Sequence, residues 1–303
     1  MPNRSKGISP QAKGQRRLVW IVVGVMVVWY LVFMIFPLGY SFVGSFFDWN
    51  IANGTFKFNG LDNYRVIFTT PKFRASLVNG IVFSVVTTIA RVGLAAMFAA
   101  LIFFCGKRMQ KFYRVVFFLP IVISFVAASY LWKWYFDGKN GLINHLIFMI
   151  SGTRGPNWLK NGDYALTAVI IMTVWKDVGF AIIMYLAGLQ QISSSIYEAA
   201  QIDGAGRLRM FRHIMLPLLG SASTFLLVTS LIGYIPAFDQ FFIMTSGGPG
   251  TSTYVPGLYL YETAFKRYNF GQASATSFVM FAIVLVLSVI NLKMRAKRSE
   301  KLL

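Results

Sequence analysis

Six stretches of the 303-residue chain are each apolar over about 20 residues or more, the length that an α-helix needs to cross the hydrocarbon core of a bilayer. They cover residues 18–42, 77–104, 115–136, 164–189, 217–238 and 273–292. Hydrophobic residues make up 56% of the chain and charged residues only 13%, about half of the charged fraction of soluble domains. A disordered chain is excluded as well, because such chains are poor in apolar residues. The sequence therefore predicts an all-α, polytopic membrane protein with six transmembrane helices.

The ends of these stretches carry further information. The first is too long for the core of a signal peptide, and no clear A-x-A site follows it, so we expect a retained helix. Pro37, Pro120 and Pro236 are expected near span ends, where a missing N–H is tolerated best. A shorter apolar stretch, residues 142–150, cannot cross a bilayer and is expected at the interface or on the outer face.

The loop charges predict the orientation in the membrane. The chain has 29 Lys and Arg against 10 Asp and Glu, a formal net charge of +19. Seventeen of these basic residues fall in 1–17, 105–114, 190–216 and 293–303, and nine in the longer loops 43–76, 137–163 and 239–272. Because basic loops stay in the cytoplasm, we expect both termini there. The high positive charge is thus explained by the orientation of the chain in the membrane and by contact with anionic lipid headgroups. Nucleic acid is not an expected partner.

The expected organisation follows from the spans. A basic cytoplasmic tail, 1–17, precedes the first transmembrane helix, 18–42, and an extracytoplasmic loop, 43–76. A five-helix core, 77–293, contains a cytoplasmic loop at 190–216, and a second cytoplasmic tail, 294–303, ends the chain.

The loop before the fifth span reads SSSIYEAAQIDGAGRLRMFRHIMLP over residues 193–217. Ser195 and Glu198 have the spacing of a capping box, which predicts a short helix from about Ile196. Gly204 and Gly206 interrupt that helix, because glycine tolerates the left-handed backbone of a tight turn. A second helix is expected to follow, too polar on one side to enter lipid. Two short helices that meet at a glycine corner suit a groove on a cytoplasmic partner.

This segment resembles the signature of the binding-protein-dependent ABC importer permeases, which is EAA, three residues, Gly, nine residues and Ile-x-Leu-Pro. The spacing is intact here. The matching residues are Glu198, Ala199, Ala200, Gly204, Ile214, Leu216 and Pro217, with Asp203 in the IDGA extension (202–205) that is typical of the sugar permeases. An amphipathic interfacial hairpin is the alternative interpretation.

The resemblance extends over nearly the whole chain to the maltose-type carbohydrate subfamily, and to its first, MalF-like permease. GLDNY at 60–64 is similar to the GL-[DE]-NY element of that subfamily, and GLIN at 141–144 is similar to its GLIN element. TSGGPGTST at 245–253 resembles the outer loop before the last span, and residues 268–275 resemble the approach to that span. The large periplasmic insert and extra N-terminal helices of the enterobacterial maltose protein are missing, which leaves the substrate open.

The resemblance implies a subunit of a larger assembly in the bacterial cytoplasmic (inner) membrane. A second, similar permease would complete the pore, two ATPase subunits would dock beneath it, and an extracytoplasmic solute-binding protein would deliver sugar from above. The EAA loop would transmit ATPase closure to the spans. Glu198 would supply charge toward the ATPase, the two alanines would allow close packing, and Gly204 would permit the corner.

This chain itself shows no sequence for ATP hydrolysis. It has no GxxxxGK[ST] loop to hold phosphates, no Ser/His/acid or metal constellation, one cysteine, Cys105, and two histidines, His145 and His213. No bound cofactor and no enzymatic activity are therefore expected of it, and ATP and Mg²⁺ would be used by the partner ATPase.

A sugar site needs hydrogen-bonding groups and aromatic platforms in a concave, otherwise apolar place. In the fifth span four residues recur at i, i+3, i+4 and i+7, which is one helical face: Ser230, Gly233, Tyr234 and Ala237. In the fourth span the candidates are Trp175, Lys176, Asp177 and Phe180, with Gly179 thinning the wall. Packing between helices would use the same small and hydroxyl residues, so both interpretations stay open.

Charged residues within the spans are costly and normally face a partner or a water-filled cavity. Lys176 and Asp177 are adjacent and cannot lie on one helix face, so one is expected against a neighbouring helix and the other toward the cavity. A structural pair that involves Arg91 is the alternative. If Arg91 or Lys176 faces the cavity, an acidic saccharide or a polyol phosphate similar to glycerol 3-phosphate becomes a candidate substrate.

The outer GGPG turn, Gly247, Gly248, Pro249 and Gly250, is expected to be an adaptable contact for the binding protein. The main hypothesis is a permease subunit of an ATP-driven importer for a sugar or oligosaccharide. An ion-coupled secondary transporter is a second hypothesis, but the broken helices typical of such carriers are not evident in the sequence. A membrane-bound enzyme or scaffold is a third.

Overall fold

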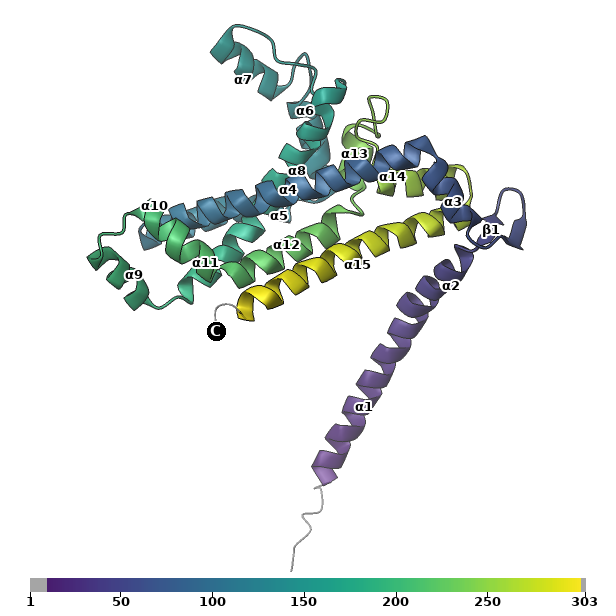
Figure 1. The fold of residues 1–303 in the computed structure, drawn as a ribbon, viewed down its shortest axis with the longest axis horizontal. Helices are drawn as coiled ribbons and strands as arrows, with labels where there is room; N and C mark the ends of the chain where they lie inside the picture. Colours follow the sequence, from purple (N-terminus) through teal and green to yellow (C-terminus); the bar gives the residue numbers. More distant parts are fainter. Residues whose placement is uncertain (1–9, 301–303) are drawn as a thin grey trace, which may run out of the picture.

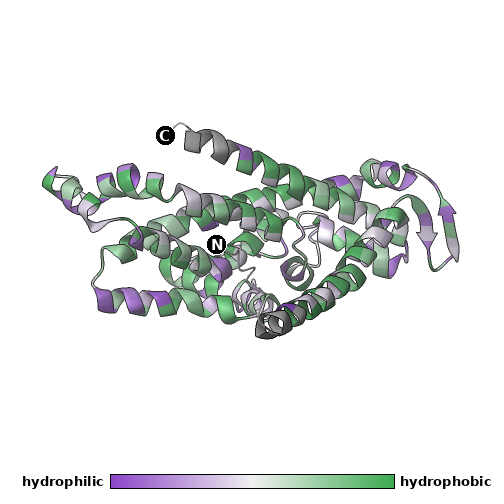
Figure 2. Ribbon diagram, turned by 90° about the horizontal axis from the view of Figure 1, so that it is seen from below, coloured by the Kyte–Doolittle hydropathy of each residue, from purple (hydrophilic) through white to green (hydrophobic). Residues whose placement is uncertain are grey.

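The computed structural model describes residues 10–300, so Arg4, Lys6 and Lys301 of the predicted basic tails lie outside it. Within that range the chain is mostly helical, as predicted. Four helices are long and apolar enough to cross a membrane, and there are up to six spans if each of two bent helix pairs is counted as one. Hydrophobic residues run along the long helices, and hydrophilic residues gather at the ends of the bundle (Figure 2).

The first span stands apart from the others (Figure 1). It consists of α1 (Pro10–Tyr30), a π-helical turn η1 (Leu31–Ile35) and α2 (Phe36–Gly44). Pro37 lies in the first turn of α2, and because it has no N–H to donate, the wider turn before it accommodates the lost bond. The apolar window of this span has none of its residues buried within the chain.

The bundle is built on α4 (Pro71–Phe103), α8 (Gly162–Gln190) and α15 (Phe270–Glu300). Fully buried small residues, among them Ala95 and Ala99 of α4 and Ala181 of α8, lie in one core cluster with larger side chains such as Ile182. Small residues at a helix contact let the two backbones approach closely, which explains how α4 and α8 form the centre of the molecule.

The third span was expected to be one helix, and this prediction was wrong. It is split into α5 (Lys107–Val122) and α6 (Phe125–Tyr135), which meet at an angle of 99°. Ile123 and Ser124 between them have extended backbone. Pro120 lies inside α5, two residues before its end, and cannot donate to the helical ladder. The break follows directly after it.

The fifth span is also bent, by 68°. A helical segment of α10 (Arg207–Met210), η2 (Phe211–Met215) and α11 (Leu216–Leu218) leads into α12 (Gly220–Tyr234). The continuous helix predicted over 217–238 is therefore interrupted by the bend at Leu219, and α12 ends at Tyr234, before Pro236. Broken helices are present after all, although the sequence did not reveal them.

The end of the bundle opposite α9 and α10 carries the short elements (Figure 1). They are a hairpin of β1 (Phe47–Asn50) and β2 (Thr55–Phe58), α3 (Asp62–Thr69), α13 (Asp239–Met244), α14 (Pro256–Tyr261) and η3 (Glu262–Lys266). In the hairpin Phe47 pairs with Phe58 and Asn50 with Thr55. This hairpin is the one departure from the predicted all-α fold within the described residues.

Two of the segments that resemble family elements, GLDNY and GLIN, each contain an asparagine that holds neighbouring segments together by hydrogen bonds. Asn63, in GLDNY, donates to the carbonyls of Ser45 and Phe47 at 2.9 and 2.8 Å and so ties α3 to the hairpin. Asn144, in GLIN, donates to the carbonyl of Gly138 and accepts from Nε1 of Trp158 at 2.8 Å. It belongs to the short helix α7 (Leu142–Ser151), which occupies the apolar stretch that was judged too short to span.

Candidate functional site

The loop at 190–216 forms the expected pair of helices. The first, α9 (Ser194–Ile202), ends in a turn in which Ala205 N–H donates to the Ala200 carbonyl at 2.9 Å and Gly204 N–H to the Gln201 carbonyl at 3.0 Å. Gly204 has a φ of +72°. This is the pattern of a Schellman motif, which requires a residue that tolerates the left-handed region. The glycine corner predicted from the sequence is confirmed.

The predicted start of α9 was wrong in detail. Ser193 precedes the first turn and no side chain caps it; its hydroxyl lies 2.8 Å from the hydroxyl of Ser195 instead. Ser195 and Glu198 therefore do not form a capping box.

The signature residues divide between an exposed tip and a base. Glu198, Ala199, Asp203 and Gly204 are exposed around the corner, and Ala200 is buried against the bundle. Ile214, Leu216 and Pro217 lie farther along, where η2 and α11 lead into α12. Ile202 and Leu208, which flank the corner, are 86% and 61% exposed. Two large apolar side chains thus stand beside the acidic residues of the tip.

A cavity of about 300 Å³ lies among α4, α6, α8 and α12. It is lined by Arg91, Phe125, Asp177, Thr229, Ser230, Gly233, Tyr234, Pro236, Ala237, Phe238, Asp239 and Gln240. The helical face predicted on the fifth span lines it in full, together with Asp177. Phe125 was missed because it follows an unpredicted break, and Asp239 and Gln240 because they belong to α13, beyond the fifth span. The other lining residues not predicted are Thr229, Pro236 and Phe238.

The other candidates of the fourth span lie outside this lining. Trp175 packs against Trp132, with ring centroids 5.4 Å apart. Phe180 lies beneath the Arg91 guanidinium at 5.7 Å. Gly179 does not thin the cavity wall: a Cβ there would lie 1.8 Å from the carbonyl oxygen of Phe117, so this glycine allows α5 and α8 to touch through their backbones.

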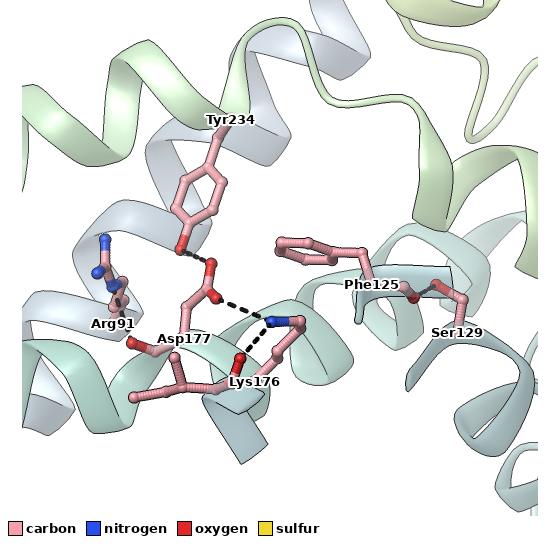
Figure 3. A network of polar contacts seen from close by, with 7 residues as sticks. Arg91, Phe125, Ser129, Lys176, Asp177 and Tyr234 are labelled. Atoms are coloured by element: carbon pink, nitrogen blue, oxygen red, sulfur yellow. Dashed lines mark hydrogen bonds and ion pairs between the residues drawn. The ribbon is translucent and has the colours of Figure 1, made fainter. Parts of the chain in front are cut away.

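A polar network joins three helices at the wall of the cavity (Figure 3). Tyr234 of α12 donates to Asp177 Oδ2 at 3.0 Å. Arg91 of α4 donates through Nη1 to the Ser230 hydroxyl at 2.7 Å and through Nε to the backbone carbonyl of Asp177 at 3.2 Å. Arg91 therefore bridges α8 and α12 and makes no ion pair with the Asp177 carboxylate.

Lys176 points the other way, toward the break between α5 and α6. Its side chain is buried, and Nζ donates to the Ile121 carbonyl at 3.4 Å and lies 4.3 Å from the centroid of the Phe125 ring. Nζ is also 3.9 Å from Asp177 Oδ1. The expectation that one of the two residues meets a neighbouring helix and the other the cavity is therefore met, with a loose ion pair between them.

The GGPG turn was expected to be adaptable, but hydrogen bonds hold it. Thr253 donates to the Thr245 hydroxyl at 2.7 Å, and Asn79 of α4 donates to the Thr251 carbonyl at 2.6 Å. Gly247 has a φ of +88°, and a Cβ there would lie 2.6 Å from the Tyr254 ring, so glycine is required on both counts. Gly248, Pro249 and Gly250 complete the turn.

An ion-pair cluster lies next to this turn and is linked to it through Tyr254. Lys72 Nζ lies 2.7 Å from Glu262 Oε2, and Tyr254 donates to the same oxygen. Partial burial works to raise the pKa of the Glu262 carboxyl, but the hydrogen bonds from Lys72 and Tyr254 outweigh it and hold that pKa below its ordinary value. Burial, and then the bond to Glu262, raise the pKa of the Tyr254 hydroxyl.

Among residues 10–300, no group of three or more His, Cys, Asp or Glu side chains is placed to hold a metal ion.

Comparison with known proteins gives a consistent result. Residues 91–296 match the model of the family described as "Binding-protein-dependent transport system inner membrane component". The probable ABC transporter permease protein YurN of Bacillus subtilis is 32% identical over 87% of this chain and 91% of its own. The lactose transport system permease protein LacF of Rhizobium radiobacter is 33% identical over 90% of this chain and 92% of its own.

The fold also has solved counterparts. A chain in the crystal structure of a bacterial alginate ABC transporter, in complex with an alginate pentasaccharide-bound periplasmic protein, superposes with a TM-score of 0.79 at 22% identity. The match covers 92% of this chain and 93% of that one. With the family match and the two permease relatives, this identifies the chain as a member of the binding-protein-dependent transport system inner membrane component family, a permease subunit of an ABC importer.

Proposed function

We propose that this permease carries a neutral sugar or oligosaccharide and that the cavity among α4, α6, α8 and α12 is part of its path. The observation that carries the proposal is the chemistry of the lining. Tyr234 and Phe238 supply aromatic surface, and Thr229 and Gln240 supply hydrogen-bonding groups. Sugars are recognised by this combination within concave sites.

The charges around the cavity favour a neutral substrate over an acidic one. Asp177 and Asp239 line it together with Arg91, and Lys176 lies beside Asp177, so there is no excess of positive charge. Arg91 already donates from two nitrogens to Ser230 and to the Asp177 carbonyl. An acidic saccharide or a polyol phosphate would have to displace these bonds. The similarity to a lactose permease supports a neutral sugar. Because the solved structural counterpart belongs to an alginate transporter, the experiment below also includes acidic substrates.

We further propose the assembly that such a subunit needs. A second permease would complete the pore, a solute-binding protein would dock at the end that carries the GGPG turn, and two separate ATPase subunits would provide the energy. The exposed corner supports the ATPase contact, because Ile202 and Leu208 offer apolar anchors next to Glu198. The loops on the same side as this corner are basic, which favours a cytoplasmic position for the corner and for both termini.

Uptake by the complete transporter in proteoliposomes tests the substrate. Radiolabelled lactose-type and other neutral oligosaccharides should be taken up only with ATP inside, and uronate oligomers and glycerol 3-phosphate should compete poorly. Tyr234→Phe and Asp177→Ala should each lower uptake about tenfold or more, because each removes one partner of a 3.0 Å hydrogen bond and leaves the other polar group unpaired.

Ser151→Ala, at an exposed hydroxyl of α7 far from the cavity, should leave uptake unchanged and serves as the control. Strong competition by uronates or polyol phosphates would shift the proposal to an acidic substrate. Normal uptake by both cavity variants at normal expression would remove the cavity from the path. Uptake driven by a proton gradient without ATP would contradict the proposed energy source.

A further inference from the structure

The helix α9 is held to the bundle by side-chain contacts in addition to its chain connections. Tyr197 is only 9% exposed, and its ring packs against Phe103 at the cytoplasmic end of α4, with centroids 5.0 Å apart. Its hydroxyl donates to the Leu189 carbonyl of α8 at 3.2 Å. That carbonyl belongs to the last turn of α8, where no helical N–H remains to pair with it. One side chain therefore attaches α9 to two spans.

The second short helix is attached to the same place. The Arg207 guanidinium of α10 lies over the Phe104 ring at 5.6 Å. Gln110 holds the end of α4, because its side chain donates to the carbonyls of Phe103 and Cys105 at 3.0 Å each. Phe103, Phe104, Tyr197 and Arg207 together form what we call the aromatic seat of the coupling loop.

The aromatic seat connects the loop to a span that is not its neighbour in the sequence. Phe103 and Arg91 are on the same helix, 12 residues apart, or about 18 Å along its axis. Arg91 holds Ser230 of α12 and the Asp177 carbonyl of α8 at the cavity wall. A displacement of α9 would thus reach the cavity along α4 as well as through α8 and α12, because a packed helix moves as a rigid element.

We infer that the aromatic seat transmits the movement of the ATPase to α4, and that Tyr197 and Phe103 are positioning residues for transport. This inference rests on the proposed function, since it requires an ATPase bound at the exposed face of the corner. It does not concern that exposed face itself, because Tyr197 is buried against the bundle, whereas Glu198 next to it is exposed.

The test separates ATP hydrolysis from transport in the complete, reconstituted transporter. Tyr197→Leu and Phe103→Leu keep apolar bulk but remove the ring contact. We expect each variant to co-purify with its ATPase and to keep ATP hydrolysis within about twofold. Each should transport about three- to tenfold less sugar per ATP, which lies within the effect that mutations have on coupling between distant sites. Tyr197→Phe keeps the ring and should retain most of the coupling.

Two further measurements keep the inference open to refutation. The double variant Tyr197→Leu with Phe103→Leu should be little worse than either single variant, because both act on one contact. Phe112→Leu removes an aromatic side chain on the same side of the protein that is 58% exposed, and it should leave sugar per ATP unchanged.

If hydrolysis and uptake fall together, so that sugar per ATP stays constant, or if the two single effects add in full, the seat is only structural and the inference is wrong. If Tyr197→Leu does not assemble, Phe103→Leu alone decides by the same ratio. Failure of the proposed function would look different: the unmutated permease would then show no bound ATPase or no ATP-driven uptake.

Discussion

Two spans of this permease are bent, by 99° between α5 and α6 and by 68° between α11 and α12. At the first bend the helical ladder stops. Ile123 and Ser124 are extended, the Ser124 hydroxyl accepts from Ala127 N–H at 3.2 Å, and Lys176 donates to the Ile121 carbonyl from another span. Side chains thus replace backbone partners that lipid cannot supply.

At the second bend the ladder continues. Leu219 N–H donates to the Met215 carbonyl at 3.0 Å, and the Leu219 carbonyl accepts from Ser223 N–H at 2.9 Å. The Ser223 hydroxyl adds a bond to the same carbonyl and another to Tyr185, but the backbone groups are already paired. The comparison indicates that the first bend, where the backbone bonds stop, depends on polar groups of a neighbouring helix, whereas the 68° bend before α12 keeps its backbone bonds.

The largest effect is expected from Lys176→Met. The variant removes the donor at the end of α5 and leaves the Asp177 carboxylate, 20% exposed, without the ammonium that lies 3.9 Å away. Asp177 keeps its bond from Tyr234, so the loss of this partner and of the bond to Ile121 should cost up to about 3–5 kcal/mol, the range for breaking a buried pair, and should lower the thermal midpoint of the purified transporter in detergent. Lys133→Met is the matched control, since that lysine is exposed and donates to the Ile243 carbonyl. Equal losses in both variants would contradict the special role of Lys176.

The second prediction compares two glycines of α8, one at each bend. A Cβ at Gly179 would lie 1.8 Å from the Phe117 carbonyl oxygen of α5, whereas one at Gly188 would lie 2.7 Å from Cδ2 of the flexible Leu219 side chain. Gly179→Ala must therefore move a backbone and should cost about 3 kcal/mol, and Gly188→Ala well under half of that. Thermal unfolding of the two variants side by side measures the difference, and a larger loss for Gly188→Ala would reverse the comparison.

The same contrast explains which parts of the fold could be predicted. The fourth span was expected over 164–189 and is α8, Gly162–Gln190, because hydropathy summed along a straight helix locates it well. Hydropathy averages over a break, however, and residues 115–136 stay apolar throughout. Pro120 and Ser124 were the local signs of the break, but the residue that stabilises it, Lys176, comes more than 50 positions later and could not be connected to it from the sequence.

The candidate sites show the same division between local and distant information. Ser230, Gly233, Tyr234 and Ala237 were found because the 3.6-residue period is a local property. Phe125 was missed because only the tertiary fold brings it to them. At the coupling loop, the conformation of Gly204 was predictable, but three consecutive serines at 193–195 offer three possible helix starts, and their pattern alone does not choose among them.

A smaller effect is expected from Ser124→Ala. The serine is the N-cap of α6, and its loss leaves Ala127 N–H without a partner next to the break; such substitutions typically cost about 1 kcal/mol. Ser129→Ala in the same helix is the control, because that hydroxyl only adds a bond to the Phe125 carbonyl at 2.7 Å. A thermal midpoint lowered in Ser124→Ala but not in Ser129→Ala is the expected result, and equal midpoints would mean that the first bend needs no cap.

The smallest effect should come from the second bend, when both members of its hydroxyl pair are removed together. Tyr185 and Ser223 lie 2.8 Å apart, and Tyr185→Phe with Ser223→Ala leaves neither hydroxyl unpaired, while the Leu219 carbonyl keeps its bond from Ser223 N–H. Replacing both partners of a buried hydrogen bond is nearly neutral, whereas removing one costs about 1–3 kcal/mol. The double variant should therefore unfold within about 0.5 kcal/mol of the unmutated protein, and Ser223→Ala alone, which leaves the Tyr185 hydroxyl unpaired, should be less stable than the double variant. A large loss in the double variant would show that this bend also depends on side-chain bonds, and the distinction between the two bends would no longer hold.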